Sequence, residues 1–87
     1  MRPRLRAGAK LKFDRHGDRW MLLGPERALE LGETARAIVE LCDGVRTEEE
    51  IVKVLAQRFD GPEGKIADDV ARLLTELRAR TLIEDAP

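Results

Sequence analysis

The pattern of apolar and polar residues predicts three short strands in the first third of the chain. Residues 11–14 and 28–31 alternate apolar and polar side chains, as strands with one buried face do, and residues 19–23 include a continuous apolar run. Turn-forming residues separate these stretches, at His16-Gly-Asp18 and at Gly24-Pro25. We therefore expect a three-stranded antiparallel meander, which needs helices over one face to be stable.

Helical spacing follows the predicted sheet. An apolar stripe at i, i+3, i+4 and i+7 is formed by Ala35, Ile38, Val39 and Cys42. We expect this first helix to end at Asp43-Gly44, because the glycine suits the left-handed position after a helix. A capping box between Thr47 and Glu50 predicts a second helix from Glu48 to about Arg58. The residues that this helix is expected to bury are Ile51, Val52, Leu55 and Phe59.

A third helix is predicted to be the longest. The second helix ends at Asp60-Gly-Pro62, and the third begins within Glu63–Lys65. Its apolar residues at helical spacing are Ile66, Val70, Leu73, Leu74 and Leu77. Leu82-Ile83 is expected to pack back on the core. The order predicts an α+β fold with a small three-stranded antiparallel sheet followed by three helices, similar to a winged helix-turn-helix.

Length and charge divide the chain into two parts. The 87 residues contain no internal repeat and have room for one domain, which we assign to residues 10–87. Residues 1–13 contain five basic residues and no acid, although the whole chain has a net charge of −1. Residues 1–9 therefore form a basic N-terminal arm. This arm is either a partly disordered terminus or a contact surface for nucleic acid, an acidic peptide or a protein partner.

Composition disfavours membrane proteins and enzymes. No apolar run reaches the ~18 residues of a membrane span, and the basic start lacks the apolar segment of a signal peptide, so we expect a cytoplasmic protein without a membrane partner. The single cysteine, Cys42, fits a reducing compartment and a place in the core, and His16 lies in a solvated turn. Neither has an evident partner for nucleophilic or metal chemistry. We expect no enzyme activity, no catalytic residue, no cofactor and no metal.

Two kinds of binding protein remain compatible with the sequence. A winged-helix nucleic-acid-binding or regulatory protein is the alternative, but the third helix opens with Asp68-Asp69 and carries Glu76, which suits a phosphate surface poorly. We therefore expect no nucleic-acid partner. The strand at residues 28–31 offers a peptide site, because the outer edge of a sheet has unpaired N–H and C=O groups that accept an extended chain. The same edge can pair with a second copy, so a homodimer also stays open.

Four stretches of the chain carry a recognisable order and spacing. They are Leu22-Leu-Gly-Pro-Glu-Arg27, Leu41-Cys-Asp-Gly-Val-Arg-Thr47, Glu50-Ile51 and Asp69-Val70. Together they resemble the PqqD family of pyrroloquinoline quinone (PQQ) biosynthesis, and only Arg2–Ala9 lies outside the resemblance. It implies a peptide chaperone that recognises a ribosomally made, modified peptide. The precursor peptide PqqA would add as a strand to the third strand, beside the third helix, and be presented to the radical SAM enzyme PqqE, which holds the iron–sulfur clusters.

Carried onto this chain, the resemblance implies a peptide site on one strand and one helix. The strand residues are Arg27, Ala28, Leu29, Glu30 and Leu31. The helix residues are Asp69, Val70, Arg72, Leu73, Leu74, Glu76 and Leu77. The sequence leaves open which of the apolar residues form the floor of the groove and which form the core below it. The polar margin, made of Asp69, Arg72 and Glu76, is our candidate for selectivity.

Overall fold

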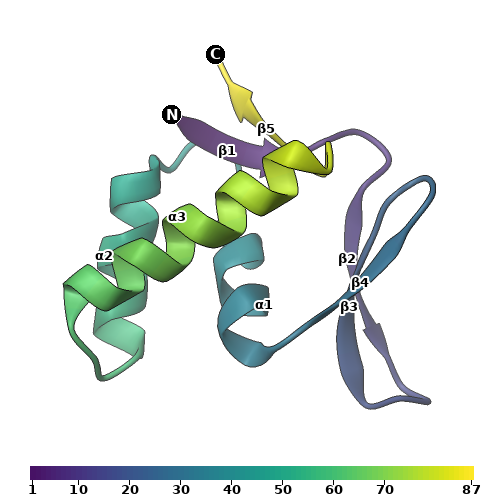
Figure 1. Ribbon diagram of the computed structural model, residues 1–87, viewed down its shortest axis with the longest axis horizontal. Helices are drawn as coiled ribbons and strands as arrows, with labels where there is room; N and C mark the ends of the chain where they lie inside the picture. The colour runs from purple at the N-terminus through teal and green to yellow at the C-terminus, as the bar shows by residue number, and fades with distance from the viewer.

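The structure is a computed structural model that describes residues 1–87 as five strands and three helices (Figure 1). The strands are β1 (Arg2–Leu5), β2 (Lys10–Asp14), β3 (Arg19–Leu23), β4 (Ala28–Leu31) and β5 (Ile83–Ala86). The helices are α1 (Glu33–Glu40), α2 (Glu48–Arg58) and α3 (Glu63–Ala79). None of the three helices combines the length and the apolar character needed to cross a bilayer.

The three-stranded sheet has the predicted order β2-β3-β4, with both pairs antiparallel. Leu22 of β3 lies opposite Leu11 on one side and Leu29 on the other. In the next row on the same face, Trp20 lies between Phe13 and Leu31. The predicted meander is therefore confirmed, and the helices lie to one side of it in Figure 1.

A second, two-stranded sheet joins the two ends of the chain, where β1 pairs antiparallel with β5. Pro3 of β1 is fully buried, and its carbonyl accepts the N–H of Gly44 at 2.9 Å. Arg4 reaches Glu84 of β5 at 2.8 Å. This differs from the predicted basic arm over residues 1–9, because Arg2–Leu5 form a strand. The partner strand lies about 80 residues further along the chain, so the local pattern around residues 1–9 could not predict the pairing.

The first helix is shorter than predicted. It ends at Glu40 rather than at Asp43-Gly44. The last turn tightens, because the N–H groups of Leu41 and Cys42 donate to the Ile38 and Val39 carbonyls three residues back, at 3.1 and 3.0 Å. In the turn that follows, the carboxylate of Asp43 accepts the backbone N–H groups of Val45 and Arg46, both at 2.9 Å. The glycine does adopt the predicted left-handed conformation, with a φ of +80°, but in the turn beyond the helix.

The second helix begins as predicted. The Thr47 hydroxyl accepts the N–H of Glu50 at 3.1 Å, and the Glu50 carboxylate accepts the N–H of Thr47 at 2.8 Å. Together these bonds form the predicted capping box. Both α2 and α3 start where the sequence placed them.

The core is aliphatic and lies between the helices and the inner face of the sheet. Its most deeply buried members are Leu22, Ile38, Ile51, Leu55, Val70, Leu74, Leu77 and Leu82. Trp20 closes one end of this core: it stacks edge-on against Phe13 at 5.3 Å, and the guanidinium of Arg36 lies over its ring at 5.3 Å. The predicted return of Leu82-Ile83 to the core is confirmed.

Candidate functional site

The free edge of β4 is the first feature of the candidate site. The strand pairs with β3 along one edge only, since it is the last strand in the sheet order. At the turn into β4, the carbonyl of Arg27 accepts the N–H of Gly24 at 2.8 Å, so the polar backbone groups of Arg27 face β3. Backbone groups alternate between the two edges of a strand. Ala28 and Glu30 therefore direct their N–H and C=O groups to the free edge, and Leu29 and Leu31 direct theirs to β3.

The side chains of β4 separate into two faces. Leu29 and Leu31 lie on the inner face, where Leu31 is buried and Leu29 half-buried. Ala28 and Glu30 are exposed on the outer face, as is Arg27 just before the strand. Of the five predicted strand residues, Ala28 and Glu30 thus offer backbone groups at the free edge, and Leu31 belongs to the core.

The predicted helix residues divide by burial. Val70, Leu74 and Leu77 are 0%, 0% and 1% exposed, so they belong to the core. Leu73 is half-buried at the margin of that core. This answers the question that the sequence left open, because burial assigns three of the four apolar residues of α3 to the interior.

The three polar residues of α3 lie at its surface and pair locally. The side chain of Arg72 is 76% exposed and lies 3.5 Å from the Asp69 carboxylate. Glu76 pairs with Arg80 one turn further on, at 3.1 Å. Such exposed pairs contribute little to stability, so these side chains are available to change partners.

The closest backbone contacts of β4 are with β3 and α1, and those of α3 are with α2 and β5. The link between strand and helix is α1, which follows β4 after a single residue, Gly32. A site that uses both predicted parts therefore also uses the surface of α1, which the sequence did not indicate.

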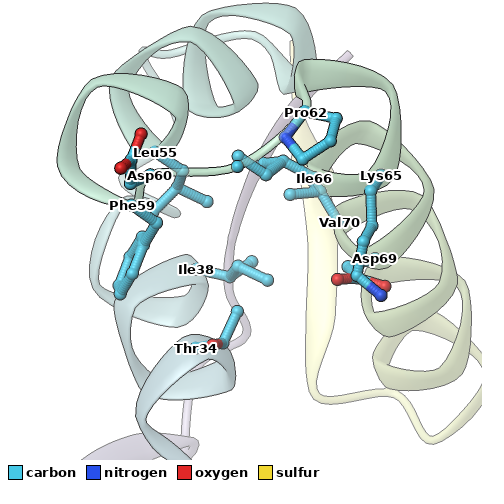
Figure 2. A pocket seen from close by; sticks show the side chains of 11 residues that line it. Thr34, Ile38, Leu55, Phe59, Asp60, Pro62, Lys65, Ile66, Asp69 and Val70 are labelled. Carbon is cyan, nitrogen blue, oxygen red and sulfur yellow. The ribbon is translucent and has the colours of Figure 1, made fainter.

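A pocket of about 150 Å³ opens where α1 faces α3 (Figure 2). Its apolar lining consists of Ile38, Leu55, Phe59, Ile66 and Val70. The polar residues around it include Thr34, Asp60, Lys65 and Asp69. Of these, the sequence singled out Asp69 and Val70 for the site and saw Ile38, Leu55, Phe59 and Ile66 only as core. Helical periodicity shows that a residue faces inward, but not that the packing around it is incomplete.

Cys42 and His16, the two residues considered for reactivity, lie where the sequence predicted. Burial raises the pKa of the Cys42 thiol to about 12, and the thiol donates to the Ile38 carbonyl at 3.3 Å. His16 is exposed in the turn between β2 and β3. The predictions of a core cysteine and a solvated histidine are confirmed. No three histidine, cysteine, aspartate or glutamate side chains gather where they could hold a metal ion.

The surface of α3 is not basic. Its acids include Asp68, Asp69 and Glu76, and Arg78 is held by Asp85 of β5 at 2.9 Å. With Arg72 paired to Asp69, Lys65 is the only cation of this helix without an ion pair. This arrangement disfavours the nucleic-acid alternative, because phosphate contacts supply most of the affinity for duplex DNA.

Known proteins share this architecture. The chain is similar to the solution structure of the PqqD truncation of Methylobacterium extorquens PqqCD, with a TM-score of 0.81 and 34% sequence identity. The match covers 94% of this chain and 87% of that one. That protein is described as a stand-alone recognition element for ribosomally synthesized and post-translationally modified peptides (RiPPs). It is also similar in fold to lasso peptide synthetase B1 complexed with a leader peptide, with a TM-score of 0.80 and 20% identity over 97% and 99% of the two chains. The fold is that of a RiPP recognition element.

The sequence comparisons agree with this class. The family model "Coenzyme PQQ synthesis protein D (PqqD)" matches residues 19–83. A relative from Xanthomonas campestris pv. campestris (strain B100), named PqqA binding protein, is 41% identical over 81 residues, which are 93% of this chain and 88% of the relative. The chain belongs to the PqqD family, and the resemblance seen in the sequence is confirmed.

Proposed function

We propose that this protein is a peptide chaperone of PQQ biosynthesis that binds the precursor peptide PqqA by strand addition to β4. The observation that carries the proposal is the free edge of β4, where Ala28 and Glu30 offer outward backbone groups. An extended peptide gains main-chain hydrogen bonds at such an edge, whatever its own sequence. The Xanthomonas relative named PqqA binding protein supports the choice of peptide.

Selectivity requires side chains beside the edge. Leu29 and Leu73 are half-buried, so each keeps apolar surface that a peptide can cover. The polar margin of Asp69, Arg72 and Glu76 carries both charge signs and can discriminate between peptides. In this proposal Val70, Leu74 and Leu77 hold α3 in place and make no contact with the peptide.

The chain acts by binding and not by catalysis. As the resemblance implies, the bound peptide is presented to PqqE, which supplies the iron–sulfur chemistry that crosslinks it. The cytoplasm is the compartment that this role requires, because ribosomes release the peptide there. A second copy of the chain is the competing occupant of the β4 edge, and a homodimer built on that edge would dissociate as peptide binds.

An amide NMR titration of the labelled protein tests the proposal. A synthetic PqqA peptide from the same genome should shift the amide signals of Ala28 and Glu30 most strongly, together with signals of Leu73 and its neighbours. Duplex DNA at physiological salt should shift none of them. Shifts with DNA alone, centred on α3, would replace the chaperone by a winged-helix nucleic-acid binder.

A further inference from the structure

The outer face of the three-stranded sheet is covered by no helix. Figure 1 places α1, α2 and α3 to the opposite side of β2, β3 and β4. Trp20 and Leu22 of β3 lie on the inner face, and side chains alternate between the two faces of a strand. Met21 and Leu23 therefore point to the outer face. Two apolar side chains thus lie on the uncovered side of the sheet.

Met21 and Leu23 are half-buried, yet they take no part in the core. Neither belongs to the buried cluster or to the half-buried residues that pack against it. Their cross-strand neighbours in β2 are Lys12 and Lys10, respectively. Lysine stems cover apolar surface while their ammonium groups stay in water. This cover consists of flexible side chains, so a binding partner can displace it and reach the apolar surface.

A hollow of about 500 Å³ lies over this face, between β2, β3 and the turn that joins them. Met21, Leu23 and Phe13 line it, and Phe13 is 38% exposed. The hollow is several times larger than the ~150 Å³ that holds one benzene ring in an apolar cavity. It therefore fits a segment of protein surface rather than one small group.

The charges around the hollow are unevenly paired. Arg19 bridges the two acids of the face, Asp14 and Glu30, each at 3.1 Å. Three further cations border the face without an ion pair, namely Lys10, Lys12 and Arg15. Because the acids are already neutralised, these cations give the face a positive charge that attracts carboxylates.

Three kinds of occupant can be compared with this chemistry. A second copy of the chain would bring the same unpaired cations face to face, which costs free energy. A nucleic acid would place its phosphates against Met21 and Leu23, and Asp14 and Glu30 would repel it. A protein surface with an apolar side chain among carboxylates matches both the apolar centre of the face and its basic border.

Peptide binding at β4 leaves this face free. In the proposed function the peptide pairs with the β4 edge and covers Leu29 and Leu73, on the side of the sheet that carries the helices. The outer face can therefore be occupied at the same time. We propose that the outer face of the sheet, around Met21 and Leu23, docks an acidic, apolar-centred surface of the enzyme that receives the peptide. This docking rests on the proposed function and assigns the enzyme a place on the chain.

The two methionines make a direct test possible. Met21 lies in the hollow, whereas Met1 is 70% exposed at the N-terminus, away from the sheet, and serves as the reference (Figure 1). The full chain, labelled with ¹³C at the methionine methyls, is titrated with unlabelled PqqE holoenzyme under anaerobic conditions. We expect the Met21 methyl signal to shift and the Met1 signal to stay in place. A shift of Met1 without Met21, or of neither, would overturn the proposal.

Charge reversal provides an independent measurement. The double variant Lys12→Glu with Arg15→Glu reverses two exposed cations of the face, and the control Lys53→Glu with Arg58→Glu makes the same change at exposed positions of α2, away from the sheet in Figure 1. Biolayer interferometry should show affinity for PqqE at least about tenfold weaker for the first variant than for the control. The difference should shrink at about 1 M salt, where the Debye length is about 3 Å. Equal affinities of the two folded variants would overturn the proposal.

The PqqA peptide separates this proposal from strand addition. The two charge variants should bind the peptide equally, because they carry the same net charge and both leave β4 unchanged. Contact of PqqE with Met21, without peptide-induced amide shifts along β4, would leave the docking face standing and remove strand addition. Amide shifts along β4 with an unshifted Met21 in the presence of PqqE would do the reverse. Duplex DNA that shifts Met21 in place of the enzyme would make the face a nucleic-acid surface and overturn the proposal.

Discussion

Burial decides the role of individual residues on α3, where the sequence pattern could not. Leu73 and Leu74 are neighbours with the same side chain, yet the first is half-buried and the second fully buried. Adjacent helical positions point about 100° apart, so one reaches the margin of the core and the other its centre. The pattern predicted that both face inward. The depth of each depends on which elements pack above it.

This difference predicts distinct mutational effects. Leu74→Ala should lower the free energy of unfolding by about 2–5 kcal/mol, because it leaves a cavity in the core. Thr75→Ala, at the exposed next position, should change it by less than about 0.5 kcal/mol. Urea denaturation followed by circular dichroism measures both values. A stability of Leu74→Ala close to the wild-type value would contradict the assignment of this leucine to the core.

The thiol of Cys42 predicts a pH dependence of stability. Burial raises its pKa from an ordinary 9.0 to about 12, so the folded state favours the neutral thiol. The resulting contribution to the free energy of unfolding is complete below pH 9 and is lost as the pH rises toward 12.

The matched variant is Cys42→Ala, which has no thiol to titrate. Chemical denaturation of both proteins across this alkaline range should show a steeper loss of stability for the wild type. Parallel curves would mean that the thiol titrates normally in the folded protein.

At the scale of strands and helices, the sequence predicted the features that depend on the local pattern of residues. The strands β2 to β4 and the starts of α2 and α3 follow from alternation, turn residues and the capping box, all of which act over a few residues. The pairing of β1 with β5 was not predicted, because neither four-residue strand is stable without its distant partner. The pocket was also missed, since it depends on how α1, α2 and α3 fit together.

Removal of β1 tests whether the N-terminus belongs to the domain. Deletion of residues 1–5 removes fully buried Pro3, half-buried Leu5 and the pairing partner of β5. We expect the free energy of unfolding to fall by at least about 1.5 kcal/mol, the lower value for exposing one buried apolar side chain. Thermal denaturation measures the change. An unaltered melting temperature would instead indicate that residues 1–5 belong to a free basic arm that does not stabilise the domain.

At the scale of the whole molecule, the fold separates rigid support from binding surface. The three helices, the inner face of the three-stranded sheet and the β1–β5 pair enclose the aliphatic core, while the free edge of β4 and the pocket beside α1 stay open. A bound strand would extend the three-stranded sheet without rearranging that core. In the proposed function, an outward-facing backbone group of β4 therefore contacts the peptide.

The backbone N–H of Glu30 allows this contact to be tested at a single position. Glu30→Pro removes an N–H that faces the free edge, and proline is tolerated at such edge positions. Glu30→Ala keeps the N–H but also loses the ion pair with Arg19, so it controls for the missing carboxylate.

The decisive measurement is calorimetric titration of both variants with the PqqA peptide, after circular dichroism has shown wild-type helix content. We expect near wild-type affinity for Glu30→Ala and at least about tenfold weaker binding for Glu30→Pro, where a backbone bond is lost and the proline ring obstructs the incoming strand. Wild-type affinity of a folded Glu30→Pro protein would contradict strand addition to β4.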